Sequence, residues 1–223
     1  MRTLRTILWG LVLIVAATVS GVYVGQTFLG VGNQSAAVTG FNPISIRNAY
    51  QQAGGPFTLL DETGETITEA KFRGKPLVMF FGFTHCPDVC PTHLLDAAQW
   101  LEALGDQADD INVVFVSVDP QRDTPELLSR YVNAFDERIV GLTAKSEDDI
   151  AEIANRYGIL YDKVPFQNGD YTMNHTTDTL LFDANGRYVD FIEYVPPHVR
   201  QNANLLNADF DTNVGKLRTL IAG

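Results

Sequence analysis

The sequence predicts an α/β fold. Residues 77–83 and 111–118 are nearly continuous apolar runs, which is typical of strands that are buried on both faces of a sheet. A helical pattern follows each run, and an alternating hairpin pattern closes the chain before a last helix. Strands that alternate with helices in this order indicate an α/β fold in which helices pack on a sheet.

Each predicted element has local signals of its own. A first hairpin, 57–60 with 65–68, surrounds a turn at 61–64, and a closing hairpin, 179–182 with 188–194, has Asn185-Gly186 in its turn. Thr124 and Pro125 are a typical N-cap and first-turn pair. The other expected elements are helices over 91–104, 124–135, 146–157 and within 205–221, and a short strand over 139–142. This order is that of a thioredoxin-like fold.

The N-terminal segment predicts a membrane anchor. Arg2 and Arg5 precede an uncharged apolar run, Ile7 to Val24, that is close to the length of a spanning helix. Positive charge before the run places the N-terminus in the cytoplasm. A cleaved signal peptide is the alternative, but the run continues past the poor cleavage site Thr18-Val19-Ser20. We therefore expect an N-terminal transmembrane helix in residues 1–29, a flexible tether over 30–55, and a periplasmic domain over 56–223 held at a bacterial inner membrane.

Composition excludes some classes of function. The net charge is −11, and both bases of the first forty residues lie before the apolar run, so the rest of the chain is strongly acidic. Such a surface repels phosphate, which argues against a nucleic-acid partner. The chain has two cysteines, too few for a disulfide scaffold in a domain of this size. The close pair is instead typical of a redox-active or metal-binding site.

The chemistry is expected where the first buried strand ends. Cys86 and Cys90 follow this strand, and Pro91 places Cys90 near the N-terminus of the next helix, which stabilises a thiolate. The two sulfurs can form a disulfide or hold one ion. Thiolates select soft or borderline metals such as Cu(I), Cu(II) and Zn(II). Two thiolates leave a metal undercoordinated, and His175, expected in the loop before the closing hairpin, is the best third ligand; a hydrogen-bonded hairpin histidine is the alternative.

The other three histidines receive different interpretations. His85 adjoins Cys86 on an extended segment, so its ring is expected to point away from the site. His93 stands three residues after Cys90 on the helix and is expected to be a surface residue, although it is close enough to tune the thiolates. His198 follows two prolines and is expected in a loop.

A charged loop follows the second buried strand. Asp119 stands at the carboxyl end of this strand and could orient a ligand or a partner. Arg122 is flanked by Asp119 and Asp123, which favours a local ion pair that fixes the loop. We expect the structural role for Arg122.

These motifs resemble the Sco/SenC family of copper-binding proteins. The resemblance runs from Pro56 to Tyr194. It rests on Phe81-Gly82-Phe83-Thr84-His85-Cys86-Pro87-Asp88-Val89-Cys90-Pro91-Thr92, supported by Val118-Asp119-Pro120-Gln121-Arg122-Asp123-Thr124-Pro125 and by Tyr171 with His175-Thr176. Two positions depart from the family pattern, Asn174 where Asp is frequent and Ala144 where Gly is frequent. Neither is a proposed ligand, but the first would affect how His175 is oriented.

The resemblance implies a thioredoxin-like fold and one copper ion, Cu(I) or Cu(II), held by Cys86, Cys90 and His175. It implies delivery of copper to the dinuclear site of cytochrome c oxidase subunit II, with a copper donor protein and a thiol reductant as further partners. A member of this kind is a metallochaperone and not an enzyme.

Two other functions use the same residues. A thiol-disulfide oxidoreductase would reduce the cysteines of the oxidase site or act in redox signalling, but such proteins usually have two residues between their cysteines, and this chain has three. A thiol peroxidase would use Thr84 and Cys86 and would leave Cys90 and His175 unexplained. The wider spacing and the histidine favour metal binding.

The anchor prediction is tested by cell fractionation. Because residues 7–24 are apolar and uncharged, the full-length protein should fractionate with membranes, and alkaline carbonate should not release it. Recovery of a shortened protein in the periplasmic fraction would show instead that the segment is a cleaved signal.

Overall fold

The computed structural model describes residues 48–196, 199 and 203–223. The chain divides into two units, 1–42 and 43–223, and the described residues all belong to the second. The predicted anchor, the tether up to residue 47 and His198 lie outside the described residues. Among the residues that are described, no helix has the length and apolar character needed to cross a membrane.

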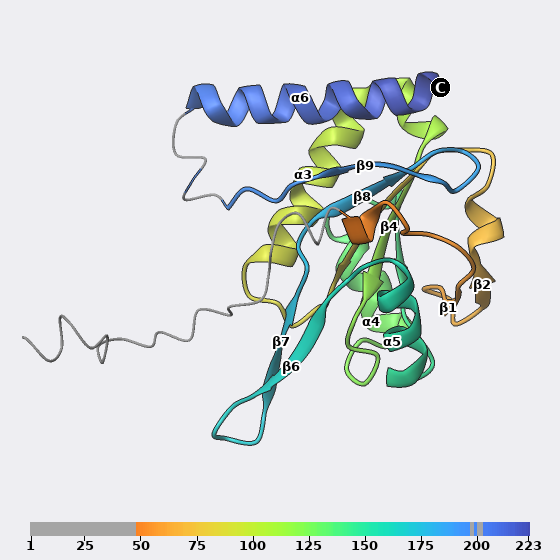
Figure 1. Cartoon of the computed structure of the whole chain (residues 1–223). Helices are drawn as coiled ribbons and strands as arrows, with labels where there is room; N and C mark the ends of the chain where they lie inside the picture. The colour runs from red at the N-terminus through yellow and green to blue at the C-terminus, as the bar shows by residue number, and fades with distance from the viewer. Residues whose placement is uncertain (1–47, 197–198, 200–202) are drawn as a thin grey trace, which may run out of the picture. The chain divides into compact units, whose positions relative to one another are not determined.

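A five-stranded sheet forms the centre of the domain (Figure 1). Its order is β5-β4-β3-β8-β9; β3, β4 and β5 are parallel, and β8 pairs antiparallel with both β3 and β9. Every residue of β3 is buried, as its continuous apolar run predicts. The strands are β3 (Leu77–Gly82), β4 (Asn112–Ser117), β5 (Ile139–Leu142), β8 (Thr179–Phe182) and β9 (Tyr188–Ile192). This arrangement is a thioredoxin-like α/β fold, and all five strands were expected from the sequence.

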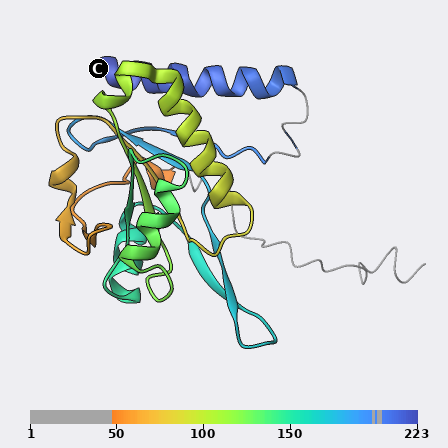
Figure 2. The same cartoon turned by 180° about the vertical axis from the view of Figure 1, so that it is seen from behind.

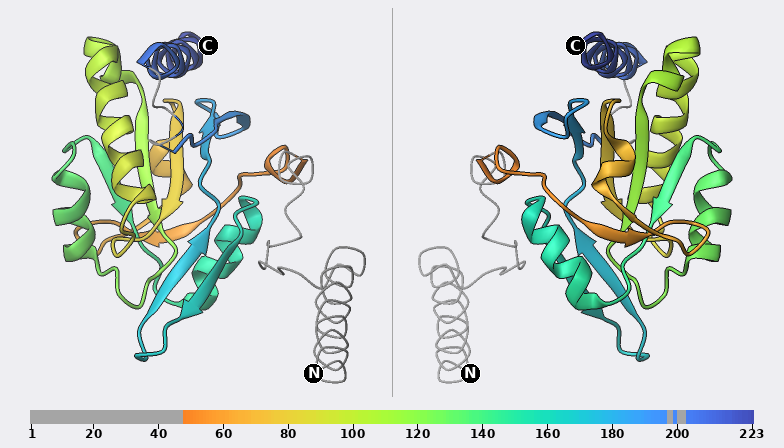
Figure 3. Two further views of the ribbon diagram at one scale, coloured as in Figure 1. Left: turned by 90° about the vertical axis from the view of Figure 1, so that its left-hand side faces the viewer. Right: turned by 90° about the vertical axis from the view of Figure 1, so that its right-hand side faces the viewer.

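Helices cover both faces of the sheet (Figure 3). On one face the ring of Phe80 contacts His93 of α3, and on the other face Phe81 contacts Tyr157 at the end of α5. Adjacent residues of a strand point to opposite faces, so the apolar run of β3 serves two layers of core at once. The helices are α3 (Val89–Leu104), α4 (Pro125–Asn133), α5 (Glu147–Arg156) and α6 (Ala203–Ala222), with 3-10 turns at η1 (Glu69–Phe72) and η2 (Gly105–Asp110).

Polar caps determine where two helices begin. The Thr124 hydroxyl accepts a hydrogen bond from the Leu127 backbone N–H at 3.3 Å, and Ser146 does the same for Asp149 at 3.2 Å. The Thr124 cap was expected, and the helix that Ser146 caps was expected to begin at this residue. Helix α3 begins at Val89, two residues earlier than expected, which places Pro91 third in the helix. A proline is tolerated there because the first N–H groups of a helix have no partner inside it.

Two small hairpins flank the central sheet (Figure 2). The expected hairpin is β1 (Thr58–Leu60) with β2 (Thr66–Thr68). A second hairpin, β6 (Tyr161–Pro165) with β7 (Tyr171–His175), was not predicted. Asn168-Gly169 between its strands is a turn signal that could have revealed it, and Gly169 adopts a φ of 86° there. His175 is thus the last residue of a strand and not part of a loop.

The packed domain begins before residue 56. Tyr50 is fully buried and Ala53 is 7% exposed, although both lie in the segment 30–55 that composition predicts to be a tether. The Tyr50 ring contacts Phe191 of β9, and its hydroxyl donates to Asp178 at 2.9 Å. The composition of this segment is dominated by small polar residues, so it did not indicate that Tyr50 belongs to the core.

Candidate metal centre

The two cysteines lie where β3 leads into α3. Cys90 is in the first turn of α3 and is 1% exposed, whereas Cys86 lies in the preceding loop and is half-buried. The Cys90 backbone N–H points at the Cys86 sulfur, with 3.4 Å between N and Sγ. The Cys86 sulfur therefore caps the helix, and a negative charge on it is stabilised by the N-terminal end of α3.

Gly82, the last residue of β3, leaves room for the Cys90 sulfur. A Cβ atom at this position would lie 2.7 Å from Cys90 Sγ and 2.7 Å from the ring of Phe115. Such distances are shorter than a carbon contact allows, so no larger residue fits unless the sulfur or the ring moves. The glycine is required by space at this position.

His175 reaches the cysteines from the end of β7. Its Nδ1 donates to the Thr176 carbonyl oxygen at 2.8 Å, and its Nε2 lies 3.5 Å from Cys90 Sγ. A carbonyl oxygen can only accept, so the proton of the neutral ring sits on Nδ1 and the lone pair of Nε2 faces the sulfurs. The Phe83 ring meets the imidazole edge-on, with 5.8 Å between centroids. Asn174 is exposed on the opposite face of the strand, so the bond to Thr176 orients His175.

The three donor atoms form one compact cluster. Cys86 Sγ, Cys90 Sγ and a nitrogen of His175 lie within 4.8 Å of one another. Metal–sulfur and metal–nitrogen bonds are about 2.0–2.3 Å long, so atoms that share an ion are separated by roughly 3–4.6 Å. Two sulfurs and one imidazole nitrogen therefore can converge on a single soft ion with small adjustments.

The two thiols differ in acidity. A hydrogen bond from the Cys90 thiol lowers the pKa of Cys86 to about 3 against the effect of burial, and the nearby His175 ring and the Cys90 backbone N–H add to the lowering. Cys90 donates this hydrogen bond, which holds its proton and raises the pKa of Cys90 well above its ordinary value. Burial of the thiol adds to the effect. In the reduced, metal-free protein Cys86 is the thiolate and Cys90 is the thiol.

The other predicted residues have mixed outcomes. His85 is exposed, its Nδ1 lies 3.1 Å from the Thr84 hydroxyl, and it is not part of the donor cluster, as expected. The prediction that His93 is a surface residue is wrong, because it is 6% exposed and its ring meets Phe80 and Tyr194 edge-on. Its position three residues after Cys90 places it on the buried stripe of α3.

The predicted ion pair of Arg122 with Asp119 is confirmed. Asp123 has different partners from those expected, since its carboxylate accepts hydrogen bonds from Ser117 and Thr84. Arg122 also donates to the Tyr171 carbonyl oxygen, a contact across 49 positions of sequence. Gly82, Thr84 and Tyr171 lie in the motifs named above, but their roles could not be read from the sequence, because these roles come from neighbours that are distant in the chain.

Known proteins resemble this chain in sequence and in fold. A family model described as SCO1/SenC matches residues 47–207. A SCO2-like protein of Rickettsia prowazekii is 40% identical over 147 residues, which are 64% of this chain and 71% of that protein. Copper-bound ScoI of Bradyrhizobium japonicum is 42% identical with a TM-score of 0.61 and covers 70% of this chain and 98% of its own. Copper-bound yeast Sco1 is 30% identical with a TM-score of 0.66 and covers 77% of this chain and 90% of its own.

The acidity of Cys86 is tested by alkylation of the reduced, metal-free protein. Because the pKa of Cys86 is lowered, its reaction with iodoacetamide should keep nearly the same rate from about pH 8 down to about pH 5. Cys90 should react far more slowly throughout. The urea-denatured chain is the control, and both of its cysteines should slow about tenfold per pH unit below pH 8. The same steep slope for Cys86 in the folded protein would contradict the assignment.

The Gly82 argument is tested by Gly82→Ala. The added methyl group collides with a sulfur and a ring, so the free energy of unfolding in urea should fall by about 1–3 kcal/mol, and metal affinity should fall with it. Gly215→Ala in α6 is the matched control, since a Cβ atom there meets nothing within 4 Å, and alanine favours a helix by up to about 1 kcal/mol. Equal behaviour of the two variants would show that the space beside Gly82 is not needed.

Proposed function

Since the chain belongs to the SCO1/SenC family, we propose that it binds one copper ion through Cys86, Cys90 and His175 and takes part in the assembly of cytochrome c oxidase. The observation that carries the proposal is the convergence of two sulfurs and an imidazole nitrogen within 4.8 Å. The two relatives described above as copper-bound have the same fold.

Copper suits this donor set better than zinc. A structural zinc site takes four protein ligands, and a catalytic zinc site takes three and a water. Within the described part of the chain, the cluster supplies three ligands, two of them soft sulfurs. Cu(I) is satisfied by two or three such ligands, and the imidazole makes the site acceptable to Cu(II) as well.

In this proposal the protein is a chaperone that hands copper to the dinuclear site of cytochrome c oxidase subunit II, and it is not an enzyme. Cys86 is half-buried, so a partner's ligand can reach it, while Cys90 holds the ion from within the core. The N-terminal anchor would keep the domain on the periplasmic face of the inner membrane, close to a membrane-bound oxidase. A copper donor protein and a thiol reductant complete the proposed set of partners.

One observation favours a second function. The thiolate of Cys86 beside the protonated Cys90 is the arrangement of a redox-active dithiol, in which one sulfur attacks and the other resolves. The alternative is therefore a thiol-disulfide oxidoreductase that reduces the cysteines of the same oxidase site. The two functions differ in their need for His175.

His175→Ala separates the two functions. It removes the nitrogen ligand but leaves the dithiol, so Cu(I) binding should weaken only in part. Cu(II) affinity should fall by at least about 100-fold, because loss even of an outer-shell partner commonly costs about 10–100-fold. Cellular cytochrome oxidase activity should fall, and added copper should restore some of it. The measurements are anaerobic Cu(I) competition and Cu(II) titration of the purified full-length protein.

His85→Gln is the matched control, because this ring is exposed and is not part of the cluster, and glutamine keeps a polar group beside Thr84 and Asp123; it should bind copper like the wild type. Cys90→Ser and the oxidised Cys86–Cys90 form should both bind copper far more weakly, since neither has two thiolates. Suppose that His175→Ala keeps wild-type Cu(II) affinity and oxidase activity, while Cys90→Ser loses both this affinity and this activity. The oxidoreductase function then replaces the copper-chaperone function.

A further inference from the structure

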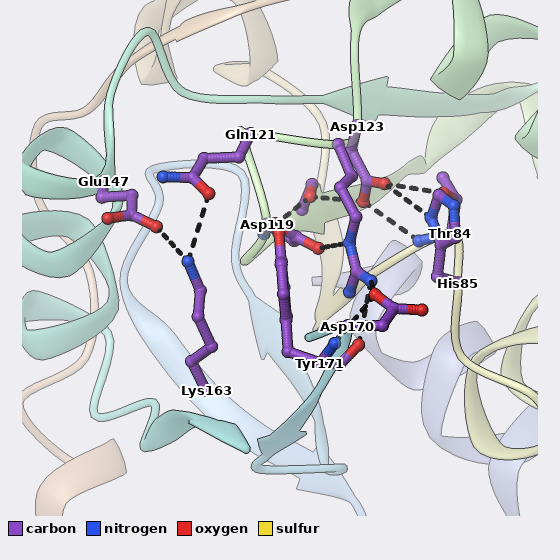
Figure 4. Close-up of polar contacts among 11 residues, drawn as sticks. Thr84, His85, Asp119, Gln121, Asp123, Glu147, Lys163, Asp170 and Tyr171 are labelled. Atoms are coloured by element: carbon purple, nitrogen blue, oxygen red, sulfur yellow. Dashed lines mark hydrogen bonds and ion pairs between the residues drawn. The ribbon is translucent and has the colours of Figure 1, made fainter. Parts of the chain in front are cut away.

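The loop that follows β4 contacts both halves of the candidate centre. We propose that this bridging loop, Asp119–Asp123, holds the histidine hairpin β6–β7 against the cysteine loop before any metal binds, and that Arg122 is its main positioning residue. The inference rests on the proposed function, because the position of His175 matters to copper only if His175 is a ligand. Figure 4 shows the polar contacts on which it is based.

On the cysteine side, the bridging loop is joined through Asp123. This carboxylate is fully buried, and it accepts hydrogen bonds from the Thr84 backbone N–H at 3.0 Å and the Thr84 hydroxyl at 2.6 Å. A third bond, also 2.6 Å, comes from Ser117 at the end of β4. Thr84 stands two residues before Cys86, so these bonds fix the start of the cysteine loop to the sheet.

On the histidine side, the bridging loop is joined through Arg122. Its Nη1 donates to the Tyr171 carbonyl oxygen at 2.9 Å, and its guanidinium carbon lies 3.7 Å from the centroid of the Tyr171 ring. The Nε of Arg122 donates to Asp119, and the other oxygen of that carboxylate accepts the Tyr171 hydroxyl at 2.8 Å. The side chains of Arg122 and Asp119 thus contact the backbone, the ring and the hydroxyl of Tyr171.

A weaker contact joins the other strand of the hairpin. Lys163 of β6 donates to Gln121 at 3.2 Å and pairs with Glu147 at 2.6 Å (Figure 4). Exposed ion pairs of this kind contribute little to stability, commonly about 0–1 kcal/mol. Among the polar contacts of the hairpin, those of Arg122 and Asp119, which is 1% exposed, are therefore the main ones. Met173 of β7, 6% exposed, adds apolar packing against the core.

The hairpin needs such an anchor. The strands β6 and β7 form a two-stranded sheet of their own, separate from the central sheet. An isolated two-stranded hairpin is marginally stable in water. Tyr171 and His175 point to the same face of β7, since they are four residues apart on one strand. Movement of Tyr171 is therefore transmitted along the strand to His175.

Arg122→Met in the full-length protein tests the proposal. Methionine keeps the length of the side chain but removes its charge and its donors. In the reduced, metal-free protein, amides of β6 and β7 should exchange with deuterium faster, while those of β3 and β4 keep wild-type rates. Cu(II) affinity should fall by about 10–100-fold, and the nitrogen hyperfine coupling in the Cu(II) electron paramagnetic resonance spectrum should weaken, as in His175→Ala.

Arg138→Met is the matched control, because Arg138 pairs with Asp136, two residues away, and should leave hairpin exchange and the spectrum unchanged. If Arg122→Met leaves Asp119 so poorly paired that the protein does not fold, Tyr171→Phe decides. It removes a single hydroxyl from the same cluster and should change both measurements in the same direction by a smaller amount.

Wild-type hairpin exchange and a wild-type spectrum in the deciding variant would overturn the proposal. The exchange measurement is made without metal, so it is independent of copper binding. A wild-type protein that binds no copper would overturn the proposed function, whereas faster exchange confined to β6–β7 would still support the anchoring of the hairpin by the bridging loop.

Discussion

The candidate centre depends on room for one sulfur atom at the end of β3. The sheet is packed on both faces, and Gly82 is the position where the packing leaves space for Cys90 Sγ. Because the sulfur enters the core there, α3 must begin close to the strand, and Cys86 must lie in the short loop between them. The difference in acidity between the thiols then follows from the position of each sulfur, one inside the core and one at the helix N-terminus.

The two halves of the centre are built in different ways. The cysteine half is continuous with the central sheet and the helix that follows it. The histidine half comes from a separate hairpin, 85 residues further along the chain from Cys90. Side-chain contacts to the loop between them, and not sheet hydrogen bonds, bring the halves together. The cysteine side of such a site is fixed by the sheet, whereas the position of the histidine side depends on the packing of Met173 and on a few polar contacts.

Sequence patterns predicted the features of the fold that depend on residues close together in the chain. The continuous apolar run of β3 and the Thr124 cap could be read from the sequence because burial and capping act over a few residues. The hairpin β6–β7 was missed because its strands are mostly polar or half-exposed, and Asn168-Gly169 was its main signal. His93 was expected on the surface, and the structure instead buries its ring between the aromatic rings of Phe80 and Tyr194. The bond that orients His175 goes to its own neighbour, Thr176, yet its effect depends on where the strand lies.

The unequal burial of the two cysteines determines from which side the candidate centre is accessible. Any ion held by these three atoms is enclosed on the side of Cys90, which is 1% exposed, and open on the side of Cys86 and His175, which are both partly exposed. A partner that loaded such an ion and a partner that removed it would therefore both have to approach from the side of Cys86 and His175, one after the other. Two such partners would compete for that side of the domain.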